Sequence, residues 1–152
     1  MLLTGTFVRV VDEKQRITLP KRIRETLASG KESSAQALFL TPGTDGSLAL
    51  YTEDVLTELG HRLANSSPNG RDVRAFSRLF YAQAEHVELD DQGRLRIPSQ
   101  LALLAGLTNE AVLIGVQDHL EIWDRTRWEA YLAARTKDFD QIAEQAFVVK
   151  SS

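Results

Sequence analysis

One short pattern occurs twice in this chain, and it constrains the fold more than any other property of the sequence. The segment from Val10 to Pro20 aligns with the segment from Glu88 to Pro98 at a constant offset of 78 residues. The Asp, Arg and Pro of the pattern are identical in the two copies, and apolar residues occupy matching positions between them. Repetition at a fixed spacing indicates two structurally equivalent units in one chain.

Each copy of the pattern predicts an extended run, a polar turn and a second extended run. Aspartate at a turn entrance can accept a hydrogen bond from the backbone two residues further on, and the alternating apolar residues after the arginine are typical of a strand. The proline then stands at the first position of a short helix, where its missing N–H costs nothing. We expect Ile23 and Leu27 to line the inner face of the first such helix, and Leu101 and Leu104 that of the second.

A hairpin and a longer helix are predicted after each short helix. The hairpins span residues 38–51 and 112–123, where two apolar runs flank a polar turn. The offset falls to 72 in this region, which places six extra residues in the polar stretch Ser29–Gln36. Thr52 and Asp124 are expected to cap the helices that follow. Apolar residues are expected to form the buried faces of three later helices: Val55, Leu56, Leu59 and Leu63; Val73, Phe76, Leu79 and Phe80; Trp128, Tyr131 and Leu132.

The duplication also predicts the fold class. A unit of four short strands and a helix cannot bury both faces of its sheet alone, whereas two units packed about a pseudo-two-fold axis can share one barrel-like core. The expected class is α+β with flanking helices. The expected divisions are a first repeat over residues 1–64, a linking loop and helix over 65–82, a second repeat over 83–136 and a C-terminal tail over 137–152.

Composition argues against an enzyme and against a metal or cofactor site. The chain contains no cysteine, which excludes disulfides, Cys-based zinc sites and thiol nucleophiles. Its three histidines are scattered, and the sequence contains no phosphate-binding loop, dinucleotide-binding glycine turn or nucleophile elbow. No apolar run approaches the roughly 18 residues that a membrane span needs, and no secretion leader is recognisable at the start. We therefore expect a cytoplasmic protein without a cofactor.

The distribution of charge indicates where a nucleic acid would bind. The net charge is −3, but residues 1–36 carry seven basic and four acidic residues, a local charge of +3. A basic segment on an acidic body is compatible with a phosphate-binding face, although a solvated surface gives the same pattern. Comparison of the two copies favours the first as the DNA face, because four of its basic residues align with uncharged residues of the second: Lys14, Lys21, Arg22 and Arg24 align with Gln92, Ser99, Gln100 and Ala102.

Tandem Asp-x-x-x-Arg turns, each followed by an apolar strand and a proline, resemble the swapped-hairpin AbrB fold. The two-copy arrangement resembles the MraZ family of bacterial transcriptional regulators, with further matches at 104–107, 112–116 and 121–123. This resemblance extends from Thr4 to about Tyr131 and implies a duplicated, pseudo-two-fold AbrB-like β-barrel made of two SpoVT-AbrB-like repeats. Two positions depart from the family's usual pattern: Gln15 stands where the first turn usually has glycine, and Ala102 stands where a basic residue often follows the second proline.

The resemblance also implies a function. It implies a nucleoid-associated regulator that binds short repeats in the promoter of the division and cell-wall gene cluster, including its own promoter as a repressor. It further implies a ring-shaped homo-oligomer, so the expected partners are double-stranded promoter DNA and other copies of the same chain. The alternatives are an AbrB-like antitoxin and a ring scaffold without sequence-specific DNA binding. Antitoxins of this kind usually have one copy and a disordered tail, whereas here two copies fill the chain.

Arg16 is the candidate for base recognition, because a guanidinium held at a turn can donate two hydrogen bonds to guanine O6 and N7. Phosphate contacts, which position a protein without specifying sequence, are expected from four other basic residues: Lys14, Lys21, Arg22 and Arg24. For Arg22 and Arg24 a solvated helix face is the equal alternative. Three further residues are expected to brace the turns or an assembly contact: Asp12, Asp90 and Arg94.

Overall fold

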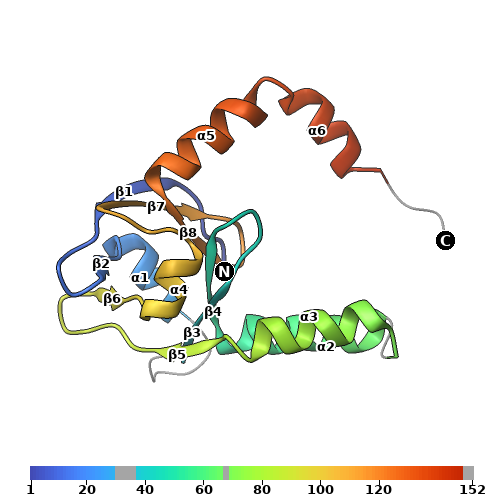
Figure 1. Ribbon diagram of the computed structural model, residues 1–152, viewed down its shortest axis with the longest axis horizontal. Helices are drawn as coiled ribbons and strands as arrows, with labels where there is room; N and C mark the ends of the chain where they lie inside the picture. The colour runs from blue at the N-terminus through green and yellow to red at the C-terminus, as the bar shows by residue number, and fades with distance from the viewer. Residues whose placement is uncertain (30–36, 67–68, 149–152) are drawn as a thin grey trace.

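The computed structural model describes residues 1–29, 37–66 and 69–148 (Figure 1). Within these ranges the chain is α+β with antiparallel strands, as the sequence predicts. The strands are β1 Thr6–Val10, β2 Arg16–Thr18, β3 Leu38–Pro42, β4 Leu48–Thr52, β5 Glu85–Val87, β6 Arg94–Arg96, β7 Glu110–Gly115 and β8 Leu120–Asp124. The helices are α1 Lys21–Ala28, α2 Glu53–Ser66, α3 Arg71–Tyr81, α4 Ser99–Leu104, α5 Arg125–Thr136 and α6 Phe139–Ala146. The six extra residues expected within Ser29–Gln36 lie almost entirely outside the described ranges.

The strand pairing follows the duplication of the sequence. One sheet has the order β1-β7-β8-β4-β3-β5, and β2 pairs with β6 in a separate two-stranded sheet. Strands β1, β3 and β4 of the first copy are equivalent to β5, β7 and β8 of the second. If equivalent strands are exchanged, the order of the sheet stays the same when it is read from the opposite edge. The first strand of each copy is paired with the hairpin of the other copy, β1 with β7 and β5 with β3. In the described residues β1 and β5 end the sheet without pairing to each other, so closure into a barrel stays a prediction.

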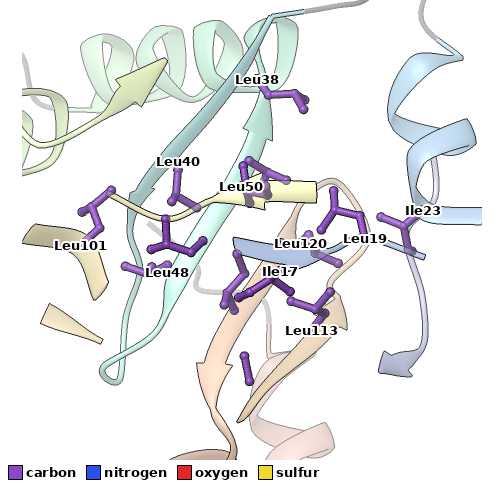
Figure 2. Close-up of a cluster of buried hydrophobic side chains, with 14 of the residues drawn as sticks. Ile17, Leu19, Ile23, Leu38, Leu40, Leu48, Leu50, Leu101, Leu113 and Leu120 are labelled. Atoms are coloured by element: carbon purple, nitrogen blue, oxygen red, sulfur yellow. The ribbon is translucent and has the colours of Figure 1, made fainter. Parts of the chain in front are cut away.

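The larger of two hydrophobic clusters in the described residues is shared by the two copies (Figure 2). Figure 2 shows Ile17 and Leu19, from β2 and the residue after it, lying among the leucines of both hairpins. Equivalent positions of the two copies are buried to the same degree, with 0–2% of each side chain exposed: Ile17 and Leu95, Leu19 and Ile97, Ile23 and Leu101. Both copies therefore supply matching parts of this core, while Val112, Ile114 and Trp123 of the second copy form a smaller, separate cluster with Trp128.

The inner face of α4 differs from its predicted pattern. Leu104 was expected to be buried and is 46% exposed, whereas Ala105 is fully buried. Ala105 is also the residue that matches the buried Leu27 at the offset of 78. Spacings of three and four residues both fit the helical period, and the position within the repeat correctly selects Ala105, four residues after Leu101.

The prediction that α3 and α5 each bury an apolar face is wrong for most of the residues named. On α3 only Phe80 is buried, while Phe76 and Leu79 are 43% and 66% exposed. On α5 no residue is buried, and Tyr131 and Leu132 are 37% and 47% exposed. The helical period identifies residues that share a face, but it does not say whether another element covers that face. In the described ranges no helix is both long enough and apolar enough to cross a lipid bilayer.

The two expected helix caps have different outcomes. Thr52 caps α2, since its Oγ1 accepts a hydrogen bond from the backbone N–H of Val55 at 3.4 Å. Asp124 precedes α5 but makes no side-chain cap. Its carboxylate instead accepts hydrogen bonds from the backbone N–H and the hydroxyl of Thr108, at 3.2 and 2.7 Å. Asp124 therefore connects the end of β8 to the loop before β7 and does not cap the first turn of α5.

Candidate nucleic-acid interface

The two Asp-x-x-x-Arg turns have the same hydrogen-bond pattern. In the first, Oδ1 of Asp12 accepts from the backbone N–H groups of Lys14 and Arg16 at 2.9 and 2.8 Å, and Oδ2 accepts from Nε of Arg16 at 2.8 Å. In the second, the equivalent distances from Asp90 are 2.9, 2.9 and 2.7 Å. Each aspartate thus holds its arginine by the Nε edge of the guanidinium. Within the described ranges no hydrogen bond engages Nη1 or Nη2 of either arginine, so these atoms can bind a ligand.

These hydrogen bonds stabilise the charged form of both carboxylates. The backbone N–H of Arg16, followed by its side chain, holds the pKa of Asp12 below its ordinary value of 3.8. The backbone N–H of Arg94, followed by its side chain, does the same for the pKa of Asp90. Desolvation raises the pKa of each aspartate, but the hydrogen bonds and the charge of the arginine together lower it by more.

A pH dependence of stability follows from these two lowered pKa values. A carboxyl group with a lowered pKa in the folded state adds stability above its unfolded pKa, and this contribution is lost as the pH falls through the folded value. We therefore expect the free energy of unfolding to fall below about pH 4. The double variant Asp12→Asn, Asp90→Asn should flatten this fall when urea unfolding is followed between about pH 5 and pH 2. Asp91→Asn is the control, since Asp91 accepts none of these hydrogen bonds, and equal slopes for all three proteins would contradict the prediction.

The turns are connected by the two-stranded ribbon of β2 and β6. In its antiparallel register Arg16 is opposite Arg96, and Thr18 is opposite Arg94. Residues opposite each other in antiparallel strands lie on the same face, and side chains alternate along each strand. The outer face of this ribbon therefore carries three arginines, while Ile17 and Leu95 of its inner face are fully buried.

Arg96 was not among the predicted site residues. It is exposed, whereas Arg16 and Arg94 are half-buried against their aspartates. Side chains two positions apart in a strand lie on the same face, so the sequence already indicates that Arg96 shares a face with Arg94. Its position opposite Arg16 depends on the pairing between the two copies, which no local pattern encodes.

Each turn is docked onto the other copy by a backbone hydrogen bond. The carbonyl of Gln15 accepts from the N–H of Ile97 at 2.8 Å, and the carbonyl of Gly93 accepts from the N–H of Leu19 at 2.9 Å. Both carbonyl-bearing residues have left-handed backbone, with φ of 61° at Gln15 and 74° at Gly93. The first turn therefore has the conformation that favours glycine without having a glycine.

Arg24 explains why the two turns differ at this position. Its Nε donates to the carbonyl of Leu19 at 3.2 Å, and a Cβ atom added to Gly93 would lie 2.6 Å from its Cδ. A side chain at position 93 therefore collides with Arg24. In the second copy the residue equivalent to Arg24 is Ala102, which has no long side chain to meet the first turn in the same way.

The backbone of Gln15 leads to a stability prediction. A non-glycine residue in the left-handed region costs about 1–2 kcal/mol, and part of any gain from glycine is offset by its more flexible unfolded chain. We expect Gln15→Gly to raise the free energy of unfolding by about 0.5–1 kcal/mol. Gln92→Gly is the matched control, because φ at Gln92 is not positive and the same exchange should destabilise. Chemical unfolding of both variants checks this, and a loss of stability in Gln15→Gly would contradict it.

The remaining predicted contact residues are not gathered on one surface. Lys14 and Lys21 are exposed, and Nζ of Lys21 lies 3.9 Å from the carboxylate of Glu25. Arg22 donates to the carbonyl of Thr4 at 3.2 Å and lies over the ring of Phe7, with its Cζ 5.5 Å from the ring centroid. The structure thus brings Arg16 together with Arg94 and Arg96 and places Arg24 at the second turn. It directs Arg22 towards the N-terminal segment.

Comparison with known proteins finds relatives that match nearly the whole chain. Residues 80–150 match the family model described as "MraZ protein, putative antitoxin-like". A protein of Nocardia farcinica named "Transcriptional regulator MraZ" is 36% identical over 95% of this chain and 96% of its own length. Proteins of the same name from Corynebacterium urealyticum and Alkaliphilus oremlandii are 38% and 35% identical, over 94% and 95% of this chain and 95% and 96% of their own lengths.

Proposed function

The chain belongs to the MraZ family, and from that premise we propose that it is a regulator of transcription that reads promoter DNA with the ribbon of β2 and β6. It is a transcriptional regulator and not an enzyme. The observation that carries the proposal is the outer face of this ribbon, where Arg16, Arg94 and Arg96 lie on one surface. A surface of this shape and charge fits a groove of DNA better than it fits a small substrate.

The ribbon enters the major groove in this proposal. That groove is about 12 Å wide and admits a two-stranded β-ribbon. Arg16 presents Nη1 and Nη2 to guanine O6 and N7, while Asp12 keeps the guanidinium oriented through Nε. Because the aspartate orients the arginine before DNA arrives, little side-chain entropy is lost on binding. Asp90 and Arg94 brace the second turn in the same way.

Phosphate contacts come from basic residues outside the outer face of the ribbon and set the affinity rather than the specificity. Lys14 extends from the first turn and Lys21 from the start of α1, and both are exposed. Arg22 and Arg24 follow on α1 and reach the sugar-phosphate backbone only by giving up the carbonyl contacts described above. Lys14 and Lys21 are therefore the stronger phosphate candidates of the four.

Self-assembly completes the proposal. The division into two SpoVT-AbrB-like repeats, 1–64 and 83–136, with the exchanged strands described above, supports a swapped-hairpin barrel in each subunit. Each subunit offers few base contacts, so a nucleoid-associated ring binds tightly by engaging successive promoter repeats with several ribbons. The proposed target is the promoter of the division and cell-wall gene cluster, which the protein represses together with its own expression.

A gel shift tests the proposal. The probe is the DNA immediately upstream of this protein's own gene, with a scrambled fragment of equal composition as the control, at one fixed salt concentration. We expect the native fragment to be bound about 10³-fold more tightly than the scrambled one. Equal, salt-sensitive binding of both fragments would overturn sequence-specific recognition and favour the antitoxin or scaffold alternative.

A further inference from the structure

Arg96 lies opposite Arg16 at a position where the side chains of two strands come close together. The backbone hydrogen bond at this end of the ribbon joins the flanking residues, from the N–H of Ile97 to the carbonyl of Gln15. Arg16 and Arg96 are therefore a pair without mutual backbone hydrogen bonds, and opposite side chains approach most closely in such pairs. Like charges at opposite positions destabilise a strand pair. The two arginines therefore favour the binding of an anion beside them.

Arg96 carries the positive charge that the aspartates of the two turns leave unpaired. Asp12 pairs with Arg16 at 2.8 Å, and Asp90 pairs with Arg94 at 2.7 Å. In the described part of the chain no carboxylate pairs with Arg96, and its guanidinium makes no hydrogen bond. Arg96 is also exposed, whereas only 25% and 27% of the Arg16 and Arg94 side chains are. An arginine that no carboxylate orients suits a phosphate better than a base edge, which requires a fixed orientation.

The surroundings of Arg96 are compatible with a phosphate group. Arg96 borders an open groove of about 370 Å³ together with the exposed residues Gln15 and Ser99. Amide and hydroxyl groups of this kind donate hydrogen bonds to DNA phosphates. His86 and Glu88 line the same groove, but both are exposed and neither pairs with Arg96 in the described residues. Water screens the charge of Glu88, so Arg96 stays available to an anion.

The second turn lacks an equivalent of Arg96. The matching position in the first copy is Thr18, which is exposed, uncharged and opposite Arg94. Arg24 contacts the second turn, but it is half-buried and its Nε donates to the carbonyl of Leu19. The pairing of β2 with β6 therefore places the unpaired arginine of the second copy at the turn of the first.

We propose that Arg96 binds a DNA phosphate beside the base that Arg16 reads, so that the first turn binds DNA more strongly than the second. This inference rests on the proposed function and adds to it a phosphate contact from the outer face of the ribbon itself. Lys14 strengthens the first turn from within its own copy, whereas Arg96 does so from the other copy. The stronger turn is thus determined by a residue across the ribbon as well as by its own sequence.

Replacing Arg96 with the residue found at the equivalent position tests the contact. In gel shifts we expect Arg96→Thr to weaken binding of the native and the scrambled promoter fragment alike, by about tenfold at about 0.1 M salt. The slope of log affinity against log salt should fall by about 1. Thermal unfolding should show this variant to be no less stable than the wild type, because it removes a like-charge pair. Arg71→Thr is the matched control, since it removes an exposed arginine from α3, which lies away from the ribbon (Figure 1), and it should bind like the wild type.

A charge exchange across the ribbon tests which turn the arginine serves. The double variant Thr18→Arg, Arg96→Thr keeps the net charge and moves the unpaired arginine from beside Arg16 to beside Arg94. With the wild-type ribbon, Arg16→Ala should cost more promoter affinity than Arg94→Ala. With the exchanged ribbon we expect this difference to shrink by at least about fivefold in the same gel shift. An effect of net charge alone would leave the difference unchanged.

The outcomes separate failure of this contact from failure of the proposed function. If the wild type binds no DNA, both are overturned. If the wild type binds and Arg96→Thr keeps its affinity and salt slope, only the role of Arg96 is overturned. A loss confined to the native fragment would overturn the phosphate contact in favour of a base contact, and an unchanged difference in the double variant would overturn the choice of turn. Equal binding of both fragments by the wild type would overturn sequence-specific recognition, while the salt slope of Arg96→Thr still decides whether Arg96 contacts phosphate.

Discussion

Replacing Arg16 with alanine is expected to abolish the specific gel shift of the promoter fragment while the protein stays folded. A bidentate arginine–guanine contact contributes about 1–3 kcal/mol of discrimination. That loss is repeated at every subunit of an assembly that engages the same DNA, so it compounds. The ribbon itself should persist, since its inner face depends on Ile17 and Leu95 rather than on Arg16. Far-UV circular dichroism and light scattering verify that fold and assembly are unchanged.

Three comparison variants identify what Arg16 contributes. Arg16→Lys keeps the charge but lacks the planar fork, so it should bind the native and scrambled fragments with nearly equal affinity. Lys14→Ala should weaken binding to both fragments alike and reduce the slope of log affinity against log salt by about 1. Arg94→Ala should cost less promoter affinity than Arg16→Ala, because the second copy has fewer basic neighbours. Wild-type promoter affinity in Arg16→Ala would refute the assignment of this residue to base recognition.

Replacing Gly115 with alanine is expected to destabilise the fold strongly, although it adds only one methyl group. Gly115 closes β7, and its N–H donates to the carbonyl of Gly5 at 2.9 Å. A Cβ atom at position 115 would lie 2.6 Å from the carbonyl carbon of Leu3 and would also meet the backbone of Thr4. Backbone cannot move aside as a flexible side chain can, so the N-terminal segment must separate from β7. We expect a loss of about 3 kcal/mol, or roughly 6–12 °C in Tm.

The same exchange in a helix provides the control. Gly60 lies within α2, where an added Cβ would meet only the hydroxyl end of Tyr81, at 3.0 Å. Alanine is favoured over glycine in a helix by about 1 kcal/mol, which offsets a small shift of that side chain. Thermal unfolding should therefore leave Gly60→Ala close to the wild type. A Tm of Gly115→Ala within about 2 °C of the wild type would show that the N-terminal segment is not held against β7 as described.

The local structure of each turn in the candidate site could be predicted from the sequence, but the way the two turns come together could not. The turn that holds Arg16 depends on contacts within five residues, and a local sequence pattern encodes contacts of that range. Arg96 was missed because its place beside Arg16 depends on a partner strand from the other copy. Arg24 was expected to contact phosphate on charge alone, yet its hydrogen bond and its contact with Gly93 direct it towards the second turn.

The repeated Asp-x-x-x-Arg pattern by itself determined that this protein has two equivalent units, each with a braced turn, an alternating strand and a proline-led helix. These conclusions rest on hydrogen bonds and periodicities that span a few residues. Only the tertiary structure decided that β1 and β5 are exchanged between the copies, that both turns lie on one ribbon, and that Gly93 is matched to Arg24. Those features arise from contacts between residues 45 to 108 positions apart, where burial and packing of the shared core select the partner.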